Sequence, residues 1–481
     1  MCVRFLLPAL VAVFPATAFA DVKPHPIFTD NMVLQRDAEL PVWGKAEAGE
    51  KVTVTVGSLT AIVETDRAGN WKAKLPASKA APKMAFTIEG KNKIEFKNVA
   101  VGDVWVCSGQ SNMEMKNSES YDLDRVKLGA KNANLRLFTV SKRTSPTPLA
   151  DQDDLKHFGK WSESAADTIP GFSAAAYYFG QNLQKSLNVP IGLIHTSWGG
   201  TPAEAWTSIE ALDAVAELKH YAASGKKAAE QFEKDKKAIG PNVPASLYNA
   251  MIHPLLPFGI KGAIWYQGES NAGRAYEYRT LFTTMIQDWR TKWGSDFPFY
   301  AVMLAPWHAG DADGVSWAEL REAQVYATKK LKNVGVAVIN DAGDLYDIHP
   351  RDKATVGNRL ALAARAGTYG QKIAGSGPSY KESKIEGDKV VIQFDNLGGG
   401  LMAKYQTLNG FTVCGEDKYF YPAKAVIVGT TIEVSSEKVP KPVAVRFGWK
   451  NYPVVNLYNK EGLPAVPFKT DDFPWTTMPK K

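Results

Sequence analysis

The amino-acid sequence predicts an α/β protein whose central parallel sheet is flanked by β domains on both sides. From Val101 to about Tyr369, short apolar segments alternate with helical stretches, the pattern of a parallel sheet covered by helices on both faces. Before and after this region, short alternating segments are separated by Gly, Pro and Asp, which is typical of β-sandwich domains. The 481 residues suffice for about three domains.

Residues 1–20 predict a secretory signal peptide. Arg4 precedes an apolar core, and Ala18-Phe19-Ala20 forms a small-residue cleavage pattern before Asp21. A transmembrane span is the alternative, but the apolar part is short and contains two prolines, and no later run is long enough to cross a bilayer. We therefore expect cleavage after Ala20 and export, with the bacterial periplasm as the expected destination and no membrane attachment of the mature chain.

The charge distribution argues against nucleic-acid binding. Without Arg4 the mature chain has 56 Lys and Arg against 50 Asp and Glu, a net charge of +6. The lysines are spread along the chain, so solubility explains them better than a nucleic-acid partner. The segment of about 208–240 is richer in lysine. This composition predicts an exposed helical hairpin inserted into the α/β domain, with its lysines in solvent; the alternative is a basic binding patch. The exposed hairpin is favoured.

The cysteines are too few for a disulfide-stapled fold. Cys2 lies in the signal peptide, which leaves Cys107 and Cys414. A bridge between them is open, but Cys107 at a strand end is expected to be a small buried apolar side chain. The sequence has no metal-ligand spacing and no glycine-rich phosphate loop, so we predict no metal and no cofactor.

Two β domains are predicted at the ends of the mature chain. Residues 21–100 contain strand-like segments such as Leu40–Gly44, Lys51–Val56 and Trp71–Leu75. This β-sandwich-like domain is expected to pack beside the next domain, with carbohydrate binding through exposed aromatic residues as the alternative. Residues 371–481 form a second β-rich domain, with strands expected at Lys389–Phe394, Gly410–Val413, Lys424–Val428 and Val443–Phe447.

The central domain, residues 101–370, carries the predicted parallel sheet. Its expected strands are Val101–Cys107, Ile191–Thr196, Gly262–Tyr266, Phe299–Met303 and Val334–Ile339. Its expected helices are Ala174–Leu187, Tyr276–Trp293, Trp317–Lys330 and Lys353–Tyr369. In such sheets the ligand site lies at the carboxyl ends of the strands, so reactive side chains are expected there.

The first strand end presents Ser111. Val101–Cys107 reads as a buried strand, Gly109 permits a sharp turn, and a helix is expected to open next. A serine at this corner is either an ordinary helix N-cap or an exposed nucleophile whose backbone N–H favours developing negative charge. By itself this stretch favours the N-cap.

The later strand ends reverse that ranking. Ser197-Trp198-Gly199-Gly200-Thr201-Pro202 offers backbone N–H groups, Gln267-Gly268-Glu269-Ser270-Asn271 offers amide and carboxylate groups, and Asp344 to His349 offers an acid close to a histidine. Acyl transfer by a serine requires a base, an acid that orients it, and donors for the oxyanion. The chain presents the serine, the oxyanion donors, and the acid together with the histidine at separate strand ends, which suits acyl transfer by a serine.

In these motifs the chain resembles the SGNH (GDSL-like) hydrolases, specifically their sialate O-acetylesterase branch. The resemblance rests on four ordered motifs, Gly109-Gln-Ser-Asn-Met113, Ser197-Trp-Gly-Gly-Thr-Pro-Ala-Glu-Ala-Trp206, Trp265-Tyr-Gln-Gly-Glu-Ser-Asn271 and Asp347-Ile-His-Pro-Arg-Asp-Lys353, and on Leu457-Tyr-Asn-Lys-Glu-Gly-Leu-Pro-Ala465 near the end. It implies an SGNH-type three-layer catalytic domain and an exported carbohydrate O-acetylesterase.

The resemblance also implies roles for individual residues. Ser111 is expected to be the nucleophile and, through its N–H, one oxyanion donor. A second donor comes from Gly199 or Gly200, with a slight preference for Gly199, and a third from the Asn271 side chain. His349 is the expected general base and then general acid. Gln110, Gln267 and Glu269 are expected polar contacts to the substrate, although Glu269 has a structural hydrogen bond as an alternative.

The acid behind His349 departs from the family pattern. The acid usually lies three residues before the histidine, where this chain has Tyr346. Asp347 is chosen for its place in the matching motif, while Asp344 and a dyad assisted by a backbone carbonyl remain open. His195, at its own strand end, competes for the role of base, but its apolar setting favours a core histidine. His253 also reads as structural.

The expected partner is an O-acetylated carbohydrate, and the oligomeric state is open. O-acetylated sialic acid is the implied substrate, with acetylated plant polysaccharide of the xylan or xyloglucan type as the alternative. Trp198, Trp206 and Trp307 are either sugar platforms or packing residues. Two rivals come from other classes, namely a non-catalytic glycan-binding protein and an acetyltransferase that uses the same serine.

Overall fold

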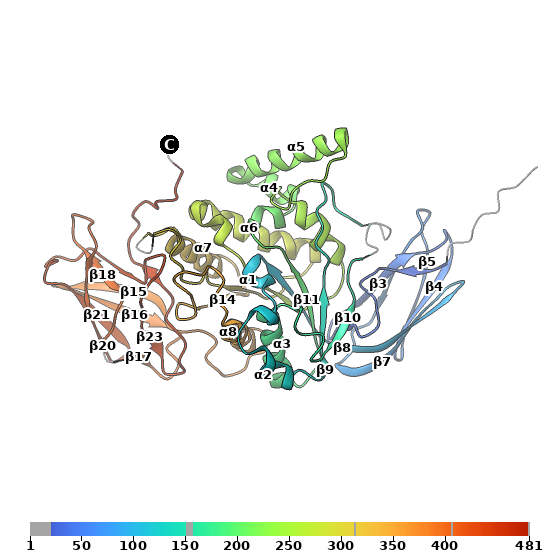
Figure 1. Ribbon diagram of the computed structural model, residues 1–481, viewed down its shortest axis with the longest axis horizontal. Coiled ribbons are helices and arrows are strands. Elements are labelled where there is room, and N and C mark those ends of the chain that lie inside the picture. Colours follow the sequence, from blue (N-terminus) through green and yellow to red (C-terminus); the bar gives the residue numbers. More distant parts are fainter. Residues whose placement is uncertain (1–20, 151–156, 312–313, 406, 480–481) are drawn as a thin grey trace, which may run out of the picture.

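The computed structural model describes residues 21–150, 157–311, 314–405 and 407–479 (Figure 1). The predicted signal peptide therefore lies outside the described residues. Figure 1 shows a centre of helices and strands with β-rich regions at its two ends, which confirms the predicted α/β class with flanking β domains. Within the described ranges, no helix combines the length and apolar character needed to cross a membrane.

The central sheet has the strand order β10-β9-β11-β8-β12-β13-β14. Its strands are β8 (Lys93–Gly109), β9 (Asn132–Thr139), β10 (Trp161–Ser164), β11 (Ile191–Ser197), β12 (Gly262–Tyr266), β13 (Phe299–Val302) and β14 (Val334–Ala337). All neighbours along this path are parallel except β10 and β9. Gly109 pairs with both Ser197 and Tyr266, so the ends of three strands lie side by side.

Helices cover both faces of this sheet. On one face, α3 (Ala174–Leu187) and α8 (Lys353–Gly367) pack against each other, and on the other α6 (Ala275–Trp293) packs against α7 (Ser316–Lys330). Side chains of β8 alternate between the two cores: Val104 and Val106 join the α6 side, while Trp105 and Cys107 join the α3 and α8 side. Because the part of β8 from Val104 to Cys107 is covered on both faces, it is an apolar run without polar alternation.

The N-terminal β region is continuous with the central sheet through β8. The first half of this 17-residue strand pairs antiparallel with β7 (Ala81–Glu89) and parallel with β2 (Val33–Gln35), and the second half belongs to the central sheet. The predicted boundary at residue 100 thus falls inside one strand. The other strands of this region are β1 (Lys23–Pro24), β3 (Leu40–Lys45), β4 (Lys51–Val56), β5 (Leu59–Glu64) and β6 (Asn70–Leu75).

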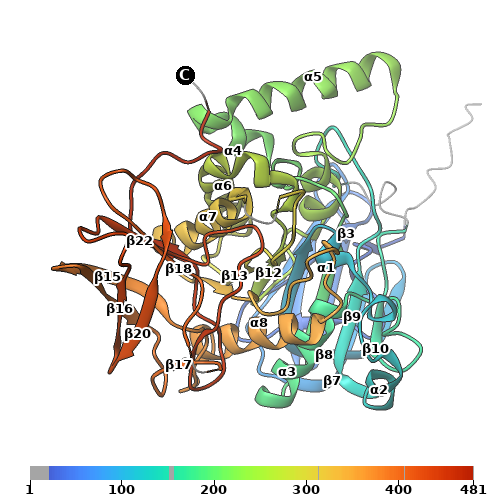
Figure 2. The same ribbon diagram turned by 60° about the vertical axis from the view of Figure 1, so that its left-hand side comes forward.

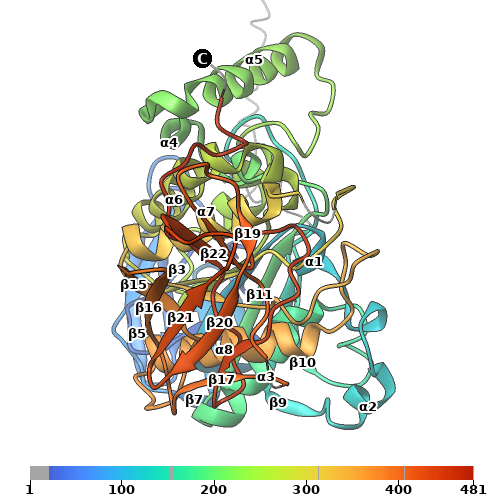
Figure 3. The same ribbon diagram turned by 90° about the vertical axis from the view of Figure 1, so that its left-hand side faces the viewer.

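The C-terminal β region has its own apolar core and three small antiparallel sheets, seen in front of the central domain in Figure 3. Its strands are β15 (Ser379–Glu386), β16 (Lys389–Asp395), β17 (Leu401–Ala403), β18 (Phe411–Cys414), β19 (Tyr421–Pro422), β20 (Lys424–Val428), β21 (Thr431–Ser435), β22 (Ala444–Phe447), β23 (Leu457–Asn459) and β24 (Phe468–Lys469). Arg321 of α7 is fully buried and donates to the carbonyls of Lys450 and Asn451 at 2.8 and 2.9 Å, which joins this region to the central domain.

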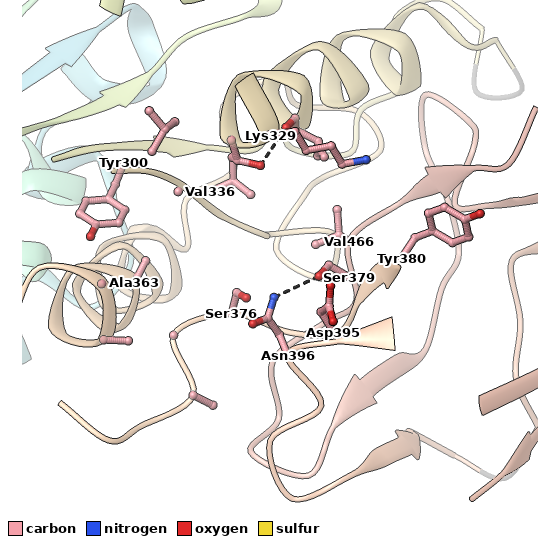
Figure 4. Close-up of a pocket in the computed structure, with 18 of the residues that line it drawn as sticks. Tyr300, Lys329, Val336, Ala363, Ser376, Ser379, Tyr380, Asp395, Asn396 and Val466 are labelled. Carbon is pink, nitrogen blue, oxygen red and sulfur yellow. Dashed lines mark hydrogen bonds between the residues drawn. The ribbon is translucent and has the colours of Figure 1, made fainter. Parts of the chain in front are cut away.

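A cavity of about 1020 Å³ lies between the C-terminal region and the edge of the central sheet (Figure 4). Tyr300 and Val336 line it from the central domain, and Tyr380 and Asn396 from the C-terminal region, where Asn396 Nδ2 donates to Ser379 Oγ at 3.0 Å. None of the predicted catalytic or oxyanion residues contributes to its lining.

The segment predicted as a helical hairpin contains α4 (Ile209–Ala214) and α5 (Lys219–Asp235), which lie above the rest of the molecule in Figures 1 and 2. Short helices α1 (Ser111–Glu114) and α2 (Leu123–Leu128) follow β8. Short stretches of 3-10 or π helix occur at Asn117–Glu119, Ala203–Trp206, Ala216–Leu218, Tyr248–Ile252, His253–Leu255 and Glu269–Arg274. Cys107 and Cys414 are both buried free thiols, so the bridge left open by the sequence is absent between them.

Candidate active site

Ser111 and His349 meet at the carboxyl edge of the central sheet. Ser111 is the first residue of α1, directly after β8, and His349 lies in the loop between β14 and α8. Ser111 Oγ and His349 Nε2 are 2.8 Å apart. With the ring neutral and its proton on Nδ1, Nε2 accepts the serine hydroxyl hydrogen, which is the contact that a general base requires.

Gly109 creates the sharp corner that presents Ser111. Its φ is 141°, and a Cβ at this position would lie 2.1 Å from the carbonyl oxygen of Tyr266. Any side chain would therefore collide with the backbone of β12. The adjacent Gln110 N–H donates to the same carbonyl at 3.0 Å, which holds the corner against β12.

Two aspartates precede His349 and make different contacts. Asp347 Oδ1 lies 3.7 Å from His349 Nδ1 and accepts the backbone N–H of His349 at 2.8 Å. Asp344 Oδ1 accepts the backbone N–H groups of Tyr346 and Asp347 at 2.8 and 3.1 Å, so it closes the turn before the histidine. Of the two carboxylates, Asp347 has the contact with the imidazole ring, although 3.7 Å is longer than a hydrogen bond.

Asp347→Asn is expected to lower kcat about tenfold and Asp344→Asn by less, because the pair is solvent-exposed and screened, unlike a buried triad acid whose loss costs about 10⁴. The side chains of His349 and Asp347 are 41% and 55% exposed. The measurement is kcat for 4-nitrophenyl acetate, and a larger loss in Asp344→Asn than in Asp347→Asn would reverse the assignment.

The predicted oxyanion donors differ in what they already bind. Gly199 N–H donates to Glu114 Oε2 at 2.6 Å. Gly200 is exposed with a φ of 76°, and its N–H has no acceptor among the described residues. Asn271 is 1% exposed, and its Nδ2 donates to Glu204 Oε2 at 3.0 Å, which occupies one of its two amide hydrogens.

Gln110, Gln267 and Glu269 make hydrogen bonds within the protein. Gln110 Oε1 accepts the N–H groups of Gly268 and Ser270, both at 3.3 Å. Gln267 is fully buried, and its amide contacts Asn271 Oδ1 at 2.6 Å. Glu269 Oε1 accepts Asn112 Nδ2 at 2.6 Å. Their predicted substrate contacts stay predictions, and the burial of the two glutamines favours support of the strand-end loops.

Two residues that the sequence reasoning gave no role, Asn112 and Lys353, connect these loops. Lys353 Nζ donates to Asn112 Oδ1 at 2.6 Å, and Asn112 Nδ2 donates to the carbonyl of Ile348 at 2.9 Å as well as to Glu269. Burial lowers the pKa of Lys353 to about 7 and raises the pKa of Glu269. Both residues lie inside sequence motifs of the family, Gly109–Met113 and Asp347–Lys353, and this position could have pointed to a role. Their contact with each other is visible only in the fold.

The lowered pKa of Lys353 predicts a pH-dependent stability. Between pH about 7 and its ordinary value of 10.5, the unfolded chain binds a proton on Lys353 that the folded protein does not. The free energy of unfolding therefore rises with pH across this window. We expect the wild type to gain stability relative to Lys353→Met between pH 6.5 and 10, measured by urea unfolding.

Lys330→Met is the matched control for this comparison, because Lys330 lies at the exposed end of α7. Its stability difference from the wild type is expected to stay constant with pH. Parallel pH curves for the wild type and Lys353→Met would contradict the assignment of a neutral buried amine.

The competing histidines have structural contacts. His195 Nε2 lies 2.6 Å from Ser197 Oγ, and burial lowers the pKa of His195 to about 4. His253 Nδ1 contacts the carbonyl of Leu149 at 3.0 Å.

Of the three tryptophans considered as sugar platforms, Trp206 is fully buried, Trp307 packs against Trp317 at 5.1 Å between ring centroids, and Trp198 is half-buried beside Lys142.

The fold and the arrangement of the strand ends are those of an SGNH-like hydrolase. Residues 101–366 match the family model described as "Carbohydrate esterase, sialic acid-specific acetylesterase". The chain belongs to this family of carbohydrate acetylesterases, which confirms the resemblance seen in the sequence.

Relatives match over most of the chain. A sialate O-acetylesterase of Homo sapiens is 31% identical over 488 residues, covering 91% of this chain and 90% of that protein. One of Rattus norvegicus is 31% identical over 415 residues, covering 74% and 76%. The crystal structure of a carbohydrate acetylesterase from Xanthomonas citri superposes with a TM-score of 0.86 at 37% identity, covering 94% of this chain and 100% of that one.

Proposed function

We propose that the protein is an exported sialate O-acetylesterase that acts through a Ser111 acetyl-enzyme. The observation that carries the proposal is the 2.8 Å contact between Ser111 Oγ and His349 Nε2 at the carboxyl edge of the sheet. The mammalian relatives are named sialate O-acetylesterases, which supports O-acetylated sialic acid as the substrate. The sequence of residues 1–20 supports export.

In the first half of the reaction, Ser111 Oγ attacks the acetyl carbonyl carbon and its proton passes to His349 Nε2. Backbone and amide N–H groups stabilise the negative charge on the carbonyl oxygen. The bond between the carbonyl carbon and the sugar oxygen then breaks, and the sugar oxygen takes the proton from His349.

In the second half, water attacks the acetyl-enzyme and gives its proton to His349. The bond to Ser111 Oγ breaks, the serine regains the proton, and acetate leaves. Asp347 is the proposed partner of the charged imidazole, and its carboxylate, 3.7 Å from Nδ1, supports that role. Each step uses only side-chain and backbone groups of this chain and water.

Acetylated plant polysaccharide of the xylan or xyloglucan type is the second candidate substrate. The Xanthomonas citri protein, 37% identical to this chain, is named a carbohydrate acetylesterase without a stated sugar, so the likeness to it fits either substrate. The acetyl site would be common to both substrates, so the two candidates differ only in the sugar that the surrounding loops accept.

The test is acetate release from O-acetylated sialoglycan beside acetylated xylan, with Ser111→Ala as the control. We expect release from the sialoglycan by the wild type and none by Ser111→Ala. Release from xylan alone selects the second candidate, and acetate release without an acceptor sugar counts against an acetyltransferase. Correctly folded protein that binds a glycan but releases no acetate from either substrate would instead identify a glycan-binding protein.

A further inference from the structure

Glu114 is the last residue of the short helix α1, which begins at Ser111. Its carboxylate contacts the loop that follows the neighbouring strand β11, residues 198–201, called here the glycine loop. Glu114 Oε2 accepts the backbone N–H of Gly199 at 2.6 Å. Lys142 forms an ion pair with Glu114, and its Nζ also lies 5.3 Å from the centroid of the Trp198 ring. Glu114 and Lys142 therefore both contact the loop that is expected to supply an oxyanion donor.

The glycine loop is tied to both sides of Ser111. Trp198 N–H donates to the carbonyl of Gly109 at 3.1 Å, two residues before the serine, and Gly199 N–H is held by Glu114, three residues after it. A Cβ on Gly199 would lie 3.3 Å from the Ser111 Cβ, so the loop backbone passes directly over the serine. Loss of the Glu114 contact would release one of these two ties.

The contact with Glu114 also decides which glycine can serve the reaction. Gly199 has one backbone hydrogen, and Glu114 already holds it in a charge-assisted bond, so serving the oxyanion would require breaking that bond. Gly200 has a φ of 76°, and its N–H has no acceptor among the residues that the structure describes. Thr201 Oγ1 donates to the carbonyl of Trp198 at 2.7 Å and closes the turn around Gly200.

We propose that Glu114 is a positioning residue that fixes the loop through Gly199 N–H, so that Gly200 N–H is the second oxyanion donor. The proposal rests on the proposed esterase function and extends it to a residue outside the Ser111, His349 and Asp347 set. It reverses the slight preference for Gly199 at the sequence level. Lys142 offsets the negative charge of Glu114, which would otherwise oppose an oxyanion nearby.

The first test compares Glu114→Ala with Glu114→Gln, using 4-nitrophenyl acetate. We expect Glu114→Ala to lower kcat about 10- to 100-fold, approaching the loss of one oxyanion donor, with KM within about threefold. Glu114→Gln keeps a carbonyl oxygen that accepts Gly199 N–H, so it is expected to stay within about threefold of the wild type. Glu119→Ala is the matched control, because Glu119 contacts the Lys116 backbone in the same segment, and it is expected to leave kcat unchanged.

Two results would overturn the proposal. An unchanged or higher kcat in Glu114→Ala would mean that the carboxylate only blocks the donor, and an equal loss in Glu114→Gln would mean that the charge, and not the hydrogen bond, matters. Thermal unfolding of each variant accompanies the kinetics, since a misfolded variant would lose activity in both substitutions.

A second test replaces one backbone N–H with oxygen by incorporating glycolic acid at position 199 or 200 in a cell-free system. At position 200 we expect a loss of about 100-fold or more in kcat. At position 199 the loss should equal that of Glu114→Ala and should not add to it. A further large loss at position 199 in the Glu114→Ala background, with none at position 200, would assign the donor to Gly199. Failure of the esterase function is distinguishable, because then the wild type itself would release no acetate.

Discussion

Ser111→Ala and His349→Ala are each expected to lower kcat by at least about 10⁴-fold, and the double variant by no more than either alone. The two side chains act as one unit through the 2.8 Å contact between Oγ and Nε2. Without the imidazole the serine hydroxyl keeps its proton, and without the hydroxyl the imidazole has no proton to take. The measurement is kcat for acetate release from a simple acetyl ester, because this reports the acyl site independently of the sugar.

His195→Gln is the matched control for the histidine. His195 lies on the adjacent strand β11, but its Nε2 contacts Ser197 and not Ser111. The kcat of the His195→Gln variant is expected to stay within about tenfold of the wild-type value. A variant His349→Ala that retains more than a tenth of the activity, or a His195→Gln variant that loses nearly all of it, would refute the assignment of His349 as the base.

Asn271→Ala is expected to lower kcat about 10²- to 10³-fold, the usual cost of one oxyanion donor, and also to lower stability. Asn271 Oδ1 accepts Ala203 N–H at 3.0 Å and Gln267 Nε2 at 2.6 Å. Because these donors are buried, each one left unpaired costs about 1–3 kcal/mol. Both kcat and the midpoint of thermal unfolding should therefore fall.

Tyr278→Phe separates the two effects of Asn271. The Tyr278 hydroxyl donates to Gln267 Oε1 at 2.9 Å, so it belongs to the same buried network without offering a hydrogen to the substrate. We expect Tyr278→Phe to lower the unfolding midpoint while kcat stays near the wild-type value. A folded Asn271→Ala variant with wild-type kcat would show that the amide stabilises the loop only, as its contact with Glu204 would allow.

Buried hydrogen bonds behind Ser111 hold the serine corner and the loop that carries His349 in a fixed relative position. Asn112 joins the serine corner to the histidine loop at Ile348, and Lys353 holds Asn112 from the first turn of α8. The serine and the histidine are 238 residues apart in sequence, yet a few hydrogen bonds among buried groups fix their separation. Fully buried polar residues, Asn112 and Lys353, thus set the geometry on which a proton transfer depends.

The sequence by itself determined the central domain, because strands covered on both faces read as apolar runs and helices keep their own period. Gly262–Tyr266 and Ala174–Leu187 have the predicted bounds. The ordered motifs also identified the family, since Ser111 and His349 lie in local stretches whose residue types are unusual together.

Only the tertiary structure revealed two kinds of strand: those interrupted by polar residues, and those that belong to two regions at once. Strand β9 was missed because Asn132, Asn134 and Arg136 interrupt its pattern, and Arg136 is buried only because distant carbonyls, such as that of Asn98 at 3.1 Å, accept its hydrogens. The length of β8 was missed because its first half pairs with the N-terminal region.

The same physical reason applies to the site. A buried amine at Lys353 and a carboxylate of Glu114 on the glycine loop depend on partners far away in the chain, because a polar side chain is buried only where the fold supplies its hydrogen bonds. No local pattern encodes such a partner. The sequence therefore predicted which residues carry the chemistry, and the tertiary structure decided which groups hold them in place.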